Sequence, residues 1–261
     1  MSYIIYPKLN IFLKIIGHDG SYHQLCSRFV LAKGALYDEM ELSKSQSFTL
    51  KGDFGCDMEE NLIFKAKCAL KAYLLAHAKE AERLESLGVE VQKSIPKGAG
   101  LGGGSANAGV FLRAVNEFLA LGLKENELLA IARDIGADVS FFASGESSAN
   151  VSGRGEQIEP FIESPLFYEI YTPPIFCDST KVYQRYGTLI KERCINYSNP
   201  PQEWLSSQSA HLLSLGIPKE EMNDLFSPAI ALYPALKDIA SELGSEWYFS
   251  GSGSSFFRLR A

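Results

Sequence analysis

The sequence predicts a mixed fold of helices and strands, of the α/β or α+β class, and three observations lead to this prediction. The chain has 261 residues, of which 46% are apolar, enough to bury one large core or two modest ones. Alternating patterns typical of strands occur at 3–17, near 28–37 and at 47–50, and return at residue 147. Between them, apolar residues repeat every three or four positions, which is typical of helices.

Composition excludes several classes of protein. The 25 Lys and Arg against 31 Asp and Glu give a net charge of −6 without a basic cluster, so nucleic acid is not an expected partner. No apolar run approaches ~18 residues, and no membrane helix is expected. Lys8, Asn10 and Lys14 interrupt the apolar N-terminal residues, which is not the pattern of a signal peptide. Five scattered cysteines and four scattered histidines indicate a reducing, cytoplasmic location and no structural zinc.

The first expected element is a strand over 3–17, in which aliphatic side chains alternate with polar or aromatic ones. One face carries Lys8, Asn10, Phe12 and Lys14, and the other carries Leu9, Ile11, Leu13 and Ile15. Because Lys8 and Asn10 share a face, both can point into a cleft. A loop over 18–23 follows, and further strands are expected near 28–37 and 47–50.

Helices are expected next. Apolar spacing predicts one over 61–87, with Glu59 and Glu60 favouring its N-terminal dipole and Gly88 at its C-terminal end. A short strand over 89–92 and a glycine-rich segment follow. Two more helices are expected, over 106–121 and 125–135, closed by Gly122 and Gly136.

The second half of the chain repeats the strand signals at 147–152, 156–161 and 167–172. The region 153–165 is the expected domain boundary, which gives an N-terminal domain over 1–155 and a C-terminal domain over 156–261. Helices are expected over 179–190, 202–215 and 222–243, then a strand ending at Phe249. A turn over 250–255 precedes the closing residues 256–259.

The strongest local signal is the segment 96–108, in which five of the seven residues from 98 to 104 are glycine. A backbone without side chains can curl and direct several N–H groups at one anion. The helix that follows adds its positive N-terminal end. The Ser105 hydroxyl can contact a phosphate oxygen or a bound Mg²⁺. The segment therefore predicts polyphosphate binding.

Two better-known phosphate motifs fit less well, and a plain flexible turn would carry fewer glycines. Gly98, Gly100 and Gly103 match the spacing of a dinucleotide-binding motif, but the acid expected about 20 residues later is Glu117, inside a predicted helix. Gly104 stands where the lysine of an ATP-binding P-loop would precede Ser105.

Several motifs resemble those of the GHMP kinases, the family of galactokinase, homoserine kinase, mevalonate kinase and phosphomevalonate kinase. The segment 96–108 is similar to their P-x-x-x-G-L-G-G-S/G-S-A/S loop. Further matches, in order along the chain, are 7–13, 22–25, 60–63, 135–142, 223–225, 233–234 and 250–253. Two departures are Ser21, inserted before Tyr22, and Ser140, which replaces a proline.

The resemblance implies a two-lobed α+β fold, with an N-terminal nucleotide-binding lobe, a C-terminal lobe and the active site in the cleft between them. It is closest to the members that use ATP and Mg²⁺ to phosphorylate the 2-hydroxyl of 4-diphosphocytidyl-2-C-methyl-D-erythritol, in the non-mevalonate isoprenoid route. A small molecule carrying a cytidine diphosphate group is then the partner, and the chain is expected as a monomer or weak homodimer.

By resemblance, Asp138 is the general base for the substrate hydroxyl and Lys8 lies beside it. Asn10 is expected to hydrogen-bond the substrate, Tyr22 and His23 to recognise cytidine, and Tyr183 to stack on the base. Asn61 is expected either to cap its helix or to contact the nucleotide. The residues expected to bind the nucleotide phosphates are Pro96, Lys97, Gly98, Ala99, Gly100, Leu101, Gly102, Gly103, Gly104, Ser105 and Ala106, with Ser105 also expected at the metal.

Other functions remain open at this point. Another GHMP kinase, acting on homoserine or mevalonate, would differ in the Tyr22 and His23 loop and in the segment around Asp138. A nucleotide-binding module without catalysis would not need Lys8 and Asp138. A dinucleotide-dependent oxidoreductase would bind NAD(P)H.

Overall fold

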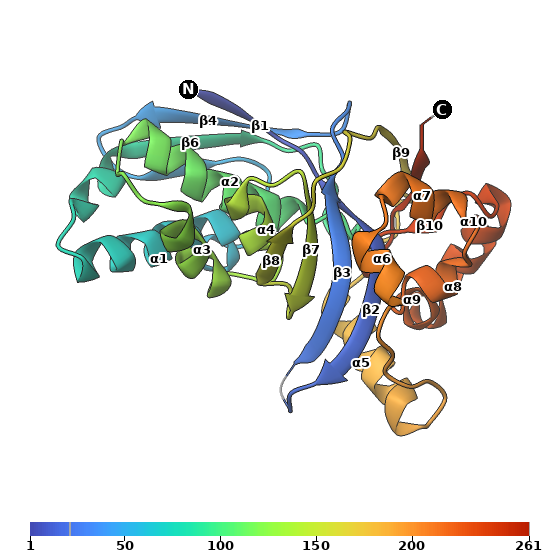
Figure 1. Cartoon of the computed structure of the whole chain (residues 1–261). Coiled ribbons are helices and arrows are strands. Elements are labelled where there is room, and N and C mark those ends of the chain that lie inside the picture. Colours follow the sequence, from blue (N-terminus) through green and yellow to red (C-terminus); the bar gives the residue numbers. More distant parts are fainter. Residues whose placement is uncertain (21, 261) are drawn as a thin grey trace. The chain divides into compact units, whose positions relative to one another are not determined.

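The computed structural model describes residues 1–20 and 22–260 (Figure 1); Ser21, the insertion noted in the sequence, lies outside them. The chain separates into two compact units, and each unit is built from three separate segments of the chain. Unit 1 comprises residues 1–7, 35–95 and 102–146, and unit 2 comprises 8–34, 96–101 and 147 onwards. The division at residues 155 and 156 expected from the sequence stays a prediction.

Unit 1 contains a four-stranded sheet in the order β1-β4-β6-β5. Its strands are β1 (Ser2–Ile5), β4 (Asp38–Lys44), β5 (Thr49–Lys51) and β6 (Leu87–Gln92). β5 runs parallel to β6, and the other pairs are antiparallel. The helices are α1 (Leu62–Ala76), α2 (Gly103–Phe118), α3 (Glu125–Arg133) and α4 (Val139–Ser144), which Figure 1 shows on one side of this sheet. Their buried residues and the sheet form one core.

The helix expected over 61–87 ends earlier than the sequence predicts. Ala78 has a left-handed backbone, with φ of 52°, so the helix cannot continue past it. Two short 3₁₀ helices flank α1, over Met58–Glu60 and Ala81–Ser86. Glu59 and Glu60 therefore lie before α1 in a separate turn, and Gly88 lies within β6 instead of closing a helix.

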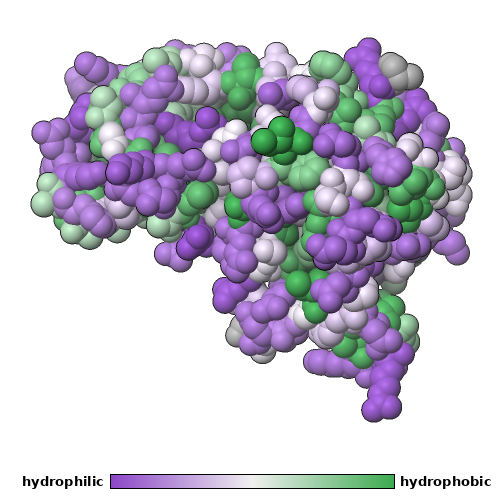
Figure 2. Space-filling view, viewed as in Figure 1, coloured by the Kyte–Doolittle hydropathy of each residue, from purple (hydrophilic) through white to green (hydrophobic). Residues whose placement is uncertain are grey.

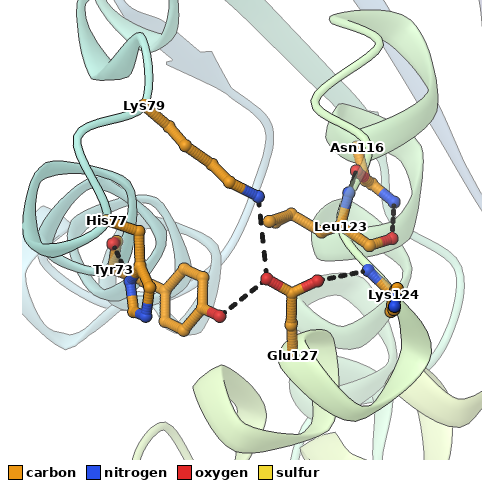
Figure 3. Close-up of polar contacts among 7 residues, drawn as sticks. All are labelled: Tyr73, His77, Lys79, Asn116, Leu123, Lys124 and Glu127. Carbon is orange, nitrogen blue, oxygen red and sulfur yellow. Dashed lines mark hydrogen bonds and ion pairs between the residues drawn. The ribbon is translucent and has the colours of Figure 1, made fainter.

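A polar cluster joins the end of α1 to the beginning of α3 (Figure 3). The Glu127 carboxylate accepts hydrogen bonds from the Tyr73 hydroxyl and the Lys124 N–H, both at 2.8 Å. The Lys79 ammonium lies 3.6 Å from the same carboxylate. Glu127 thus satisfies an N–H in the first turn of α3 while linking that turn to α1.

Unit 2 contains two sheets. The four-stranded sheet has the order β2-β3-β7-β8 and the three-stranded sheet has the order β10-β11-β9. Their strands are β2 (Lys8–His18), β3 (His23–Leu31), β7 (Ser148–Gly153), β8 (Gln157–Pro160), β9 (Tyr168–Tyr171), β10 (Tyr248–Phe249) and β11 (Phe256–Leu259). All pairs are antiparallel. The strand expected over 3–17 is therefore two strands, β1 and β2, in different sheets.

The helix expected over 179–190 is present in unit 2, but the two later helices are broken into shorter ones. They are α5 (Ser179–Lys191), α6 (Gln202–Ser206), α7 (Ser209–Ser214), α8 (Lys219–Met222), α9 (Phe226–Leu232) and α10 (Ala235–Leu243). The helix expected over 202–215 is interrupted at Ser207 and Gln208, which have extended backbones. The helix expected over 222–243 is interrupted at Asn223, also extended, and at Pro234.

A β-bulge in β2 changes which side chains share a face. Lys8 pairs with Leu31 and Asn10 with Phe29, but Phe12 pairs with Arg28, so one extra residue of β2 is accommodated after Asn10. An extra residue reverses the alternation beyond it. The expectation that Phe12 and Lys14 share a face with Lys8 is therefore wrong, while Lys8 and Asn10 do share one.

Arg28 is a buried cation in the core of unit 2. Its Nε donates to Asn150 Oδ1 at 2.7 Å, and its other nitrogens donate to the carbonyls of Leu205 at 2.9 Å and Ser207 at 3.1 Å. Burial lowers its pKa to about 10, which leaves it charged at neutral pH. Arg28 thereby satisfies carbonyl groups at the C-terminal end of α6, which no intrahelical donor reaches.

On the face drawn in Figure 2, hydrophobic residues occur in small areas separated by hydrophilic ones. None of the helices in residues 1–20 and 22–260 is long and apolar enough to cross a membrane.

Candidate active site

The glycine-rich loop has a left-handed backbone at every second residue. Gly98, Gly100 and Gly102 have φ values of 67°, 72° and 70°, whereas Ala99 and Leu101 do not have positive φ. Alternation of the two hands turns successive N–H groups toward a common point and makes a concave site for an anion. The conformation therefore fits the expected phosphate loop.

Four consecutive carbonyl groups tie the loop to the rest of unit 2. Gly98 O accepts a hydrogen bond from Cys177 N–H at 2.9 Å, and Ala99 O accepts one from Ser255 N–H at 3.1 Å. Gly100 O accepts from the Ser250 hydroxyl at 3.1 Å, and Leu101 O accepts from Lys8 N–H at 3.0 Å. In a trans peptide the C=O and the next N–H point in opposite directions. Each N–H from Ala99 to Gly102 therefore points away from the group that holds the preceding carbonyl.

Two glycines of the loop lack room for a side chain, because other residues pack directly against their backbone. A Cβ on Gly98 would lie 2.4 Å from the Phe176 ring, and one on Gly100 would lie 2.1 Å from Ser250 O. Gly104 is different: its backbone is right-handed, and a Cβ there would meet only a Leu62 methyl group, at 3.6 Å. The fold therefore requires glycine at residues 98 and 100 but not at 104.

The helix expected over 106–121 begins three residues earlier, at Gly103, with Gly102 as its N-cap. The N–H groups of Gly103, Gly104 and Ser105 consequently have no acceptor within the helix. They lie at the positive end of a helix of 16 residues. Ser105 is in this first turn, as the sequence predicts.

Lys8 and Asn10 are both buried, side by side in β2. The Lys8 ammonium donates to Asn10 Oδ1 at 2.5 Å and lies 4.7 Å from the centre of the Phe29 ring. Asn10 Nδ2 in turn donates to Ser27 Oγ at 2.9 Å. Lys8 is therefore not a solvated lysine, although β2 lies at the edge of its sheet.

The Lys8 ammonium is a neighbour of the glycine loop. A Cβ on Gly251 would lie 3.3 Å from Lys8 Nζ and 2.9 Å from Gly100 O. The expected turn over 250–255 is present, and its serines 250, 252, 254 and 255 are buried. It packs against the loop and Lys8, so unit 2 alone brings a cation and the first part of the phosphate loop together.

Asp138 lies in unit 1, half-buried, at the N-cap of α4. This short helix, which the sequence pattern did not predict, packs closely on α2. A Cβ on Gly109 would lie 2.5 Å from Phe142 Cβ and 2.8 Å from Val139 O. Asp138 thus precedes a helix that touches α2 one turn beyond Ser105. Since Lys8 belongs to unit 2, its expected approach to Asp138 stays a prediction.

Two of the residues expected to recognise cytidine lie together. The rings of His23 and Tyr183 are 5.8 Å apart and nearly parallel, at 27°. Tyr186 and Tyr197 extend this cluster, with ring centres 5.5 and 6.3 Å from that of His23. Tyr197 was not expected, because it lies in an irregular segment where no pattern marks it. Burial lowers the pKa of His23, and the nearby His18 lowers it further.

Tyr22 is separate from this ring cluster. Its side chain is 55% exposed, and the Arg154 guanidinium lies 4.2 Å from its ring centre. Its N–H donates to Asp19 Oδ1 at 2.8 Å, which closes the β2–β3 hairpin. The use of Tyr22 and His23 as a pair in base recognition stays a prediction.

Asn61 caps its helix, one of the two roles expected for it. Its Oδ1 accepts a hydrogen bond from Ile63 N–H at 2.8 Å, a standard N-cap interaction. Contact with the nucleotide stays a prediction. Asn223 is a residue whose role the spacing did not reveal: its Nδ2 donates to Phe249 O and Gly251 O, both at 2.9 Å, and so fixes the turn beside Lys8.

Donors for a metal ion are few. In residues 1–20 and 22–260, no group of three or more His, Cys, Asp or Glu side chains could hold a metal. Mg²⁺ that accompanies a nucleotide needs only one or two protein oxygens, because phosphates and water supply the rest. The Ser105 hydroxyl is an oxygen donor of that kind.

The chain is similar to proteins of one known family. Residues 61–146 match the GHMP kinases N terminal domain. A Helicobacter acinonychis protein named 4-diphosphocytidyl-2-C-methyl-D-erythritol kinase is 46% identical over 266 aligned residues, covering 99% of this chain and 96% of that protein. A Helicobacter pylori protein of the same name is 45% identical, covering 98% and 93%.

The fold agrees as well. A crystal structure of a 4-(cytidine 5'-diphospho)-2C-methyl-D-erythritol kinase is similar with a TM-score of 0.77 and 28% identity, covering 99% of this chain and 90% of that one. The expected two-lobed α+β architecture is confirmed by this similarity. The chain belongs to the 4-diphosphocytidyl-2-C-methyl-D-erythritol kinase family of the GHMP kinases.

Proposed function

We propose that this chain transfers the γ-phosphoryl group of ATP to the 2-hydroxyl of 4-diphosphocytidyl-2-C-methyl-D-erythritol, in the cytoplasm. The observation that carries the proposal is the loop of alternating left-handed glycines, held by its carbonyls beside the buried Lys8 ammonium. The names of the relatives support the choice of acceptor. The product carries a new phosphate monoester and leaves the cytidine diphosphate group intact.

Phosphoryl transfer requires a fixed phosphate chain, an in-line hydroxyl and stabilisation of charge on the transferring group. The N–H groups from Ala99 to Ser105 would bind the phosphates, together with the positive end of α2. Lys97 and Pro96 at the start of the loop, and Ala106 at its end, would contribute backbone contacts. Ser105 would offer an oxygen ligand to Mg²⁺, which when bound neutralises phosphate charge.

The acceptor hydroxyl needs a base and a fixed orientation. Asp138 would accept its proton late in the reaction, when the bond forming between the hydroxyl oxygen and the γ-phosphorus, as ADP leaves, has made the hydroxyl acidic. Lys8 would steady the hydroxyl or the phosphoryl oxygens, held in place by its hydrogen bond to Asn10. This role requires that units 1 and 2 present Asp138 and Lys8 to one substrate.

The cytidine end of the acceptor would bind at the ring cluster of His23 and Tyr183. Both faces of a pyrimidine stack well on aromatic rings, and a neutral His23, favoured by its lowered pKa, can both donate and accept a hydrogen bond. Because His23 now lies against one face of Tyr183, the base would use the other face or displace the imidazole.

The test is a substrate panel with the purified chain, ATP and Mg²⁺. ADP release is expected with 4-diphosphocytidyl-2-C-methyl-D-erythritol and not with mevalonate or homoserine, and phosphorus NMR should show a monoester beside an unchanged diphosphate. ADP release with mevalonate or homoserine alone would identify a different GHMP kinase. ATP binding without turnover of any acceptor would leave a nucleotide-binding module. Light scattering on the same sample tests the expected monomer or weak homodimer.

A further inference from the structure

Unit 1 contains a buried carboxylate that is hydrogen-bonded to the residues before and after the glycine loop. Asp38, at the start of β4, is 0% exposed. Its Oδ1 accepts from Ser94 N–H at 2.7 Å and from Ile95 N–H at 2.8 Å. Its Oδ2 accepts from Asn107 Nδ2 at 2.9 Å and from the Lys93 ammonium. Four donors therefore converge on one side chain.

These donors come from both ends of the loop. Lys93, Ser94 and Ile95 directly precede Pro96, where the loop begins, and Asn107 follows it in α2. Asn107 Oδ1 also accepts from the Lys93 ammonium at 2.8 Å, which links the two ends a second time. A single carboxylate thus holds the entry and the exit of the loop at a fixed separation.

The pairing of β4 with β1 does not require the negative charge of Asp38. Asp38 lies opposite Ile5 in the β1–β4 ladder, where an apolar residue would serve the backbone equally well. Removing a carboxylate from water is energetically unfavourable, and its hydrogen bonds only offset that cost. Because Asp38 accepts hydrogen bonds from residues on both sides of the loop, its function is to hold those residues in position.

We propose that Asp38 is a positioning residue for the triphosphate of ATP, which acts by fixing the two ends of the glycine loop. This role rests on the proposed kinase function. Asp38 is buried away from solvent and touches no substrate; it sets the curvature with which the amides from Ala99 to Ser105 converge. Loss of its charge would widen the loop and weaken phosphate binding, without direct effect on the acceptor.

The decisive variant is Asp38→Asn, which keeps the size of the side chain. We expect Kd and KM for ATP to rise at least about tenfold, with KM for the cytidine-bearing acceptor unchanged and kcat per folded molecule within about threefold. A merely structural role would lower the melting temperature and the active fraction but leave both ATP constants as they are. Nucleotide affinity is measured by titration with a non-hydrolysable ATP analogue.

A milder variant keeps the test valid if Asp38→Asn does not fold. Asn107→Ala removes the link to α2 but leaves the Lys93 and Asp38 pair, and should raise Kd for ATP about threefold or more. Glu85→Gln is the matched control, since Glu85 also holds two lysines in unit 1, Lys67 at 2.8 Å and Lys71 at 2.5 Å, but none of these residues belongs to the loop or its ends. It should lower stability without changing ATP affinity.

The outcomes separate this inference from the proposed function. Unchanged ATP affinity in folded Asp38→Asn, or in Asn107→Ala where that variant alone folds, would overturn the positioning role while leaving the kinase function in place. Failure of the unaltered chain to bind the ATP analogue would overturn the kinase function, and the positioning role with it. A rise in Kd for ATP equal to that of Glu85→Gln would also count against Asp38.

Discussion

The N–H of Lys8 donates to the carbonyl of Leu101 at 3.0 Å, so the first residue of β2 is hydrogen-bonded directly to the glycine loop. Residues 93 positions apart in the chain are thereby joined. The bond fixes the backbone from which the Lys8 side chain extends, and Asn10 fixes its ammonium.

Lys8→Met should lower kcat about 10²-fold, since it removes a cation from the site of developing phosphoryl charge. The methionine stem keeps the contact with Phe29, but the buried Asn10 Oδ1 loses its donor, so the melting temperature should fall and kcat is compared per folded molecule. Steady-state kinetics and thermal denaturation measure the two effects. Lys33→Met, an exposed lysine of the same unit, is the control and should behave as the unaltered chain. Turnover within twofold of normal in Lys8→Met would remove Lys8 from the reaction.

Asp138→Asn should retain ATP affinity while kcat falls at least about 10²-fold, the usual effect of losing a general base. The amide has the same shape but cannot accept the proton. Asp134→Asn, an exposed residue at the end of α3, serves as the matched control with normal kcat. If Asp138→Asn turns over normally, some other group takes the proton.

Gly104→Asp tests the phosphate loop without strain. A side chain has room at this position, and an acidic residue in the first turn of a helix is favourable by itself. The charge should nevertheless repel phosphate, so Kd for ATP should rise at least about tenfold while the melting temperature is maintained. Gly104→Ser, the neutral control, should bind ATP normally. Equal affinity in the two variants would show that residue 104 is not near the phosphates.

Arg28→Met should destabilise the chain by about 3–5 kcal/mol, because it leaves buried carbonyl groups and Asn150 without their donor. Urea denaturation measures this change. Arg133→Met, at an exposed position on α3, should cost no more than about 0.5 kcal/mol. A loss below about 1 kcal/mol for Arg28→Met would mean that these carbonyls find other partners.

Stability should fall as the pH is lowered below about 6.5, in part through His23. Burial lowers the pKa of His23 in the folded chain, so over this range the unfolded chain binds the proton more readily than the folded chain. Protonation then favours unfolding until the pH reaches the lower, folded pKa. In urea titrations at pH 7.5 and 5.5, His23→Gln should show a smaller loss than the unaltered chain. An identical loss would assign the pH dependence to other groups.

Much of the site could be predicted from sequence because its signals are local. The glycines at 98, 100 and 102 are adjacent in the chain, and their left-handed backbones follow from the absence of a side chain. The common face of Lys8 and Asn10 follows from strand alternation over two residues. Most of the expected helices and strands are present, but the strand expected near 28–37 ends at Leu31, and β4 was not expected. The helix ends at Ala76, Ser207 and Asn223 were also wrong, since apolar spacing continued across each break.

What the sequence alone determined is therefore a large part of the local conformation: most of the strands and helices, though not β4 or α4, and a loop able to turn its amides toward an anion. Only the tertiary structure decided that Phe12 and Lys14 leave the face of Lys8, because a bulge depends on the register with β3. It also decided that Gly251 lies between Lys8 and Gly100, and that Asp38 holds both ends of the loop. Those contacts join residues far apart in the chain, and local periodicity carries no information about which distant groups will meet.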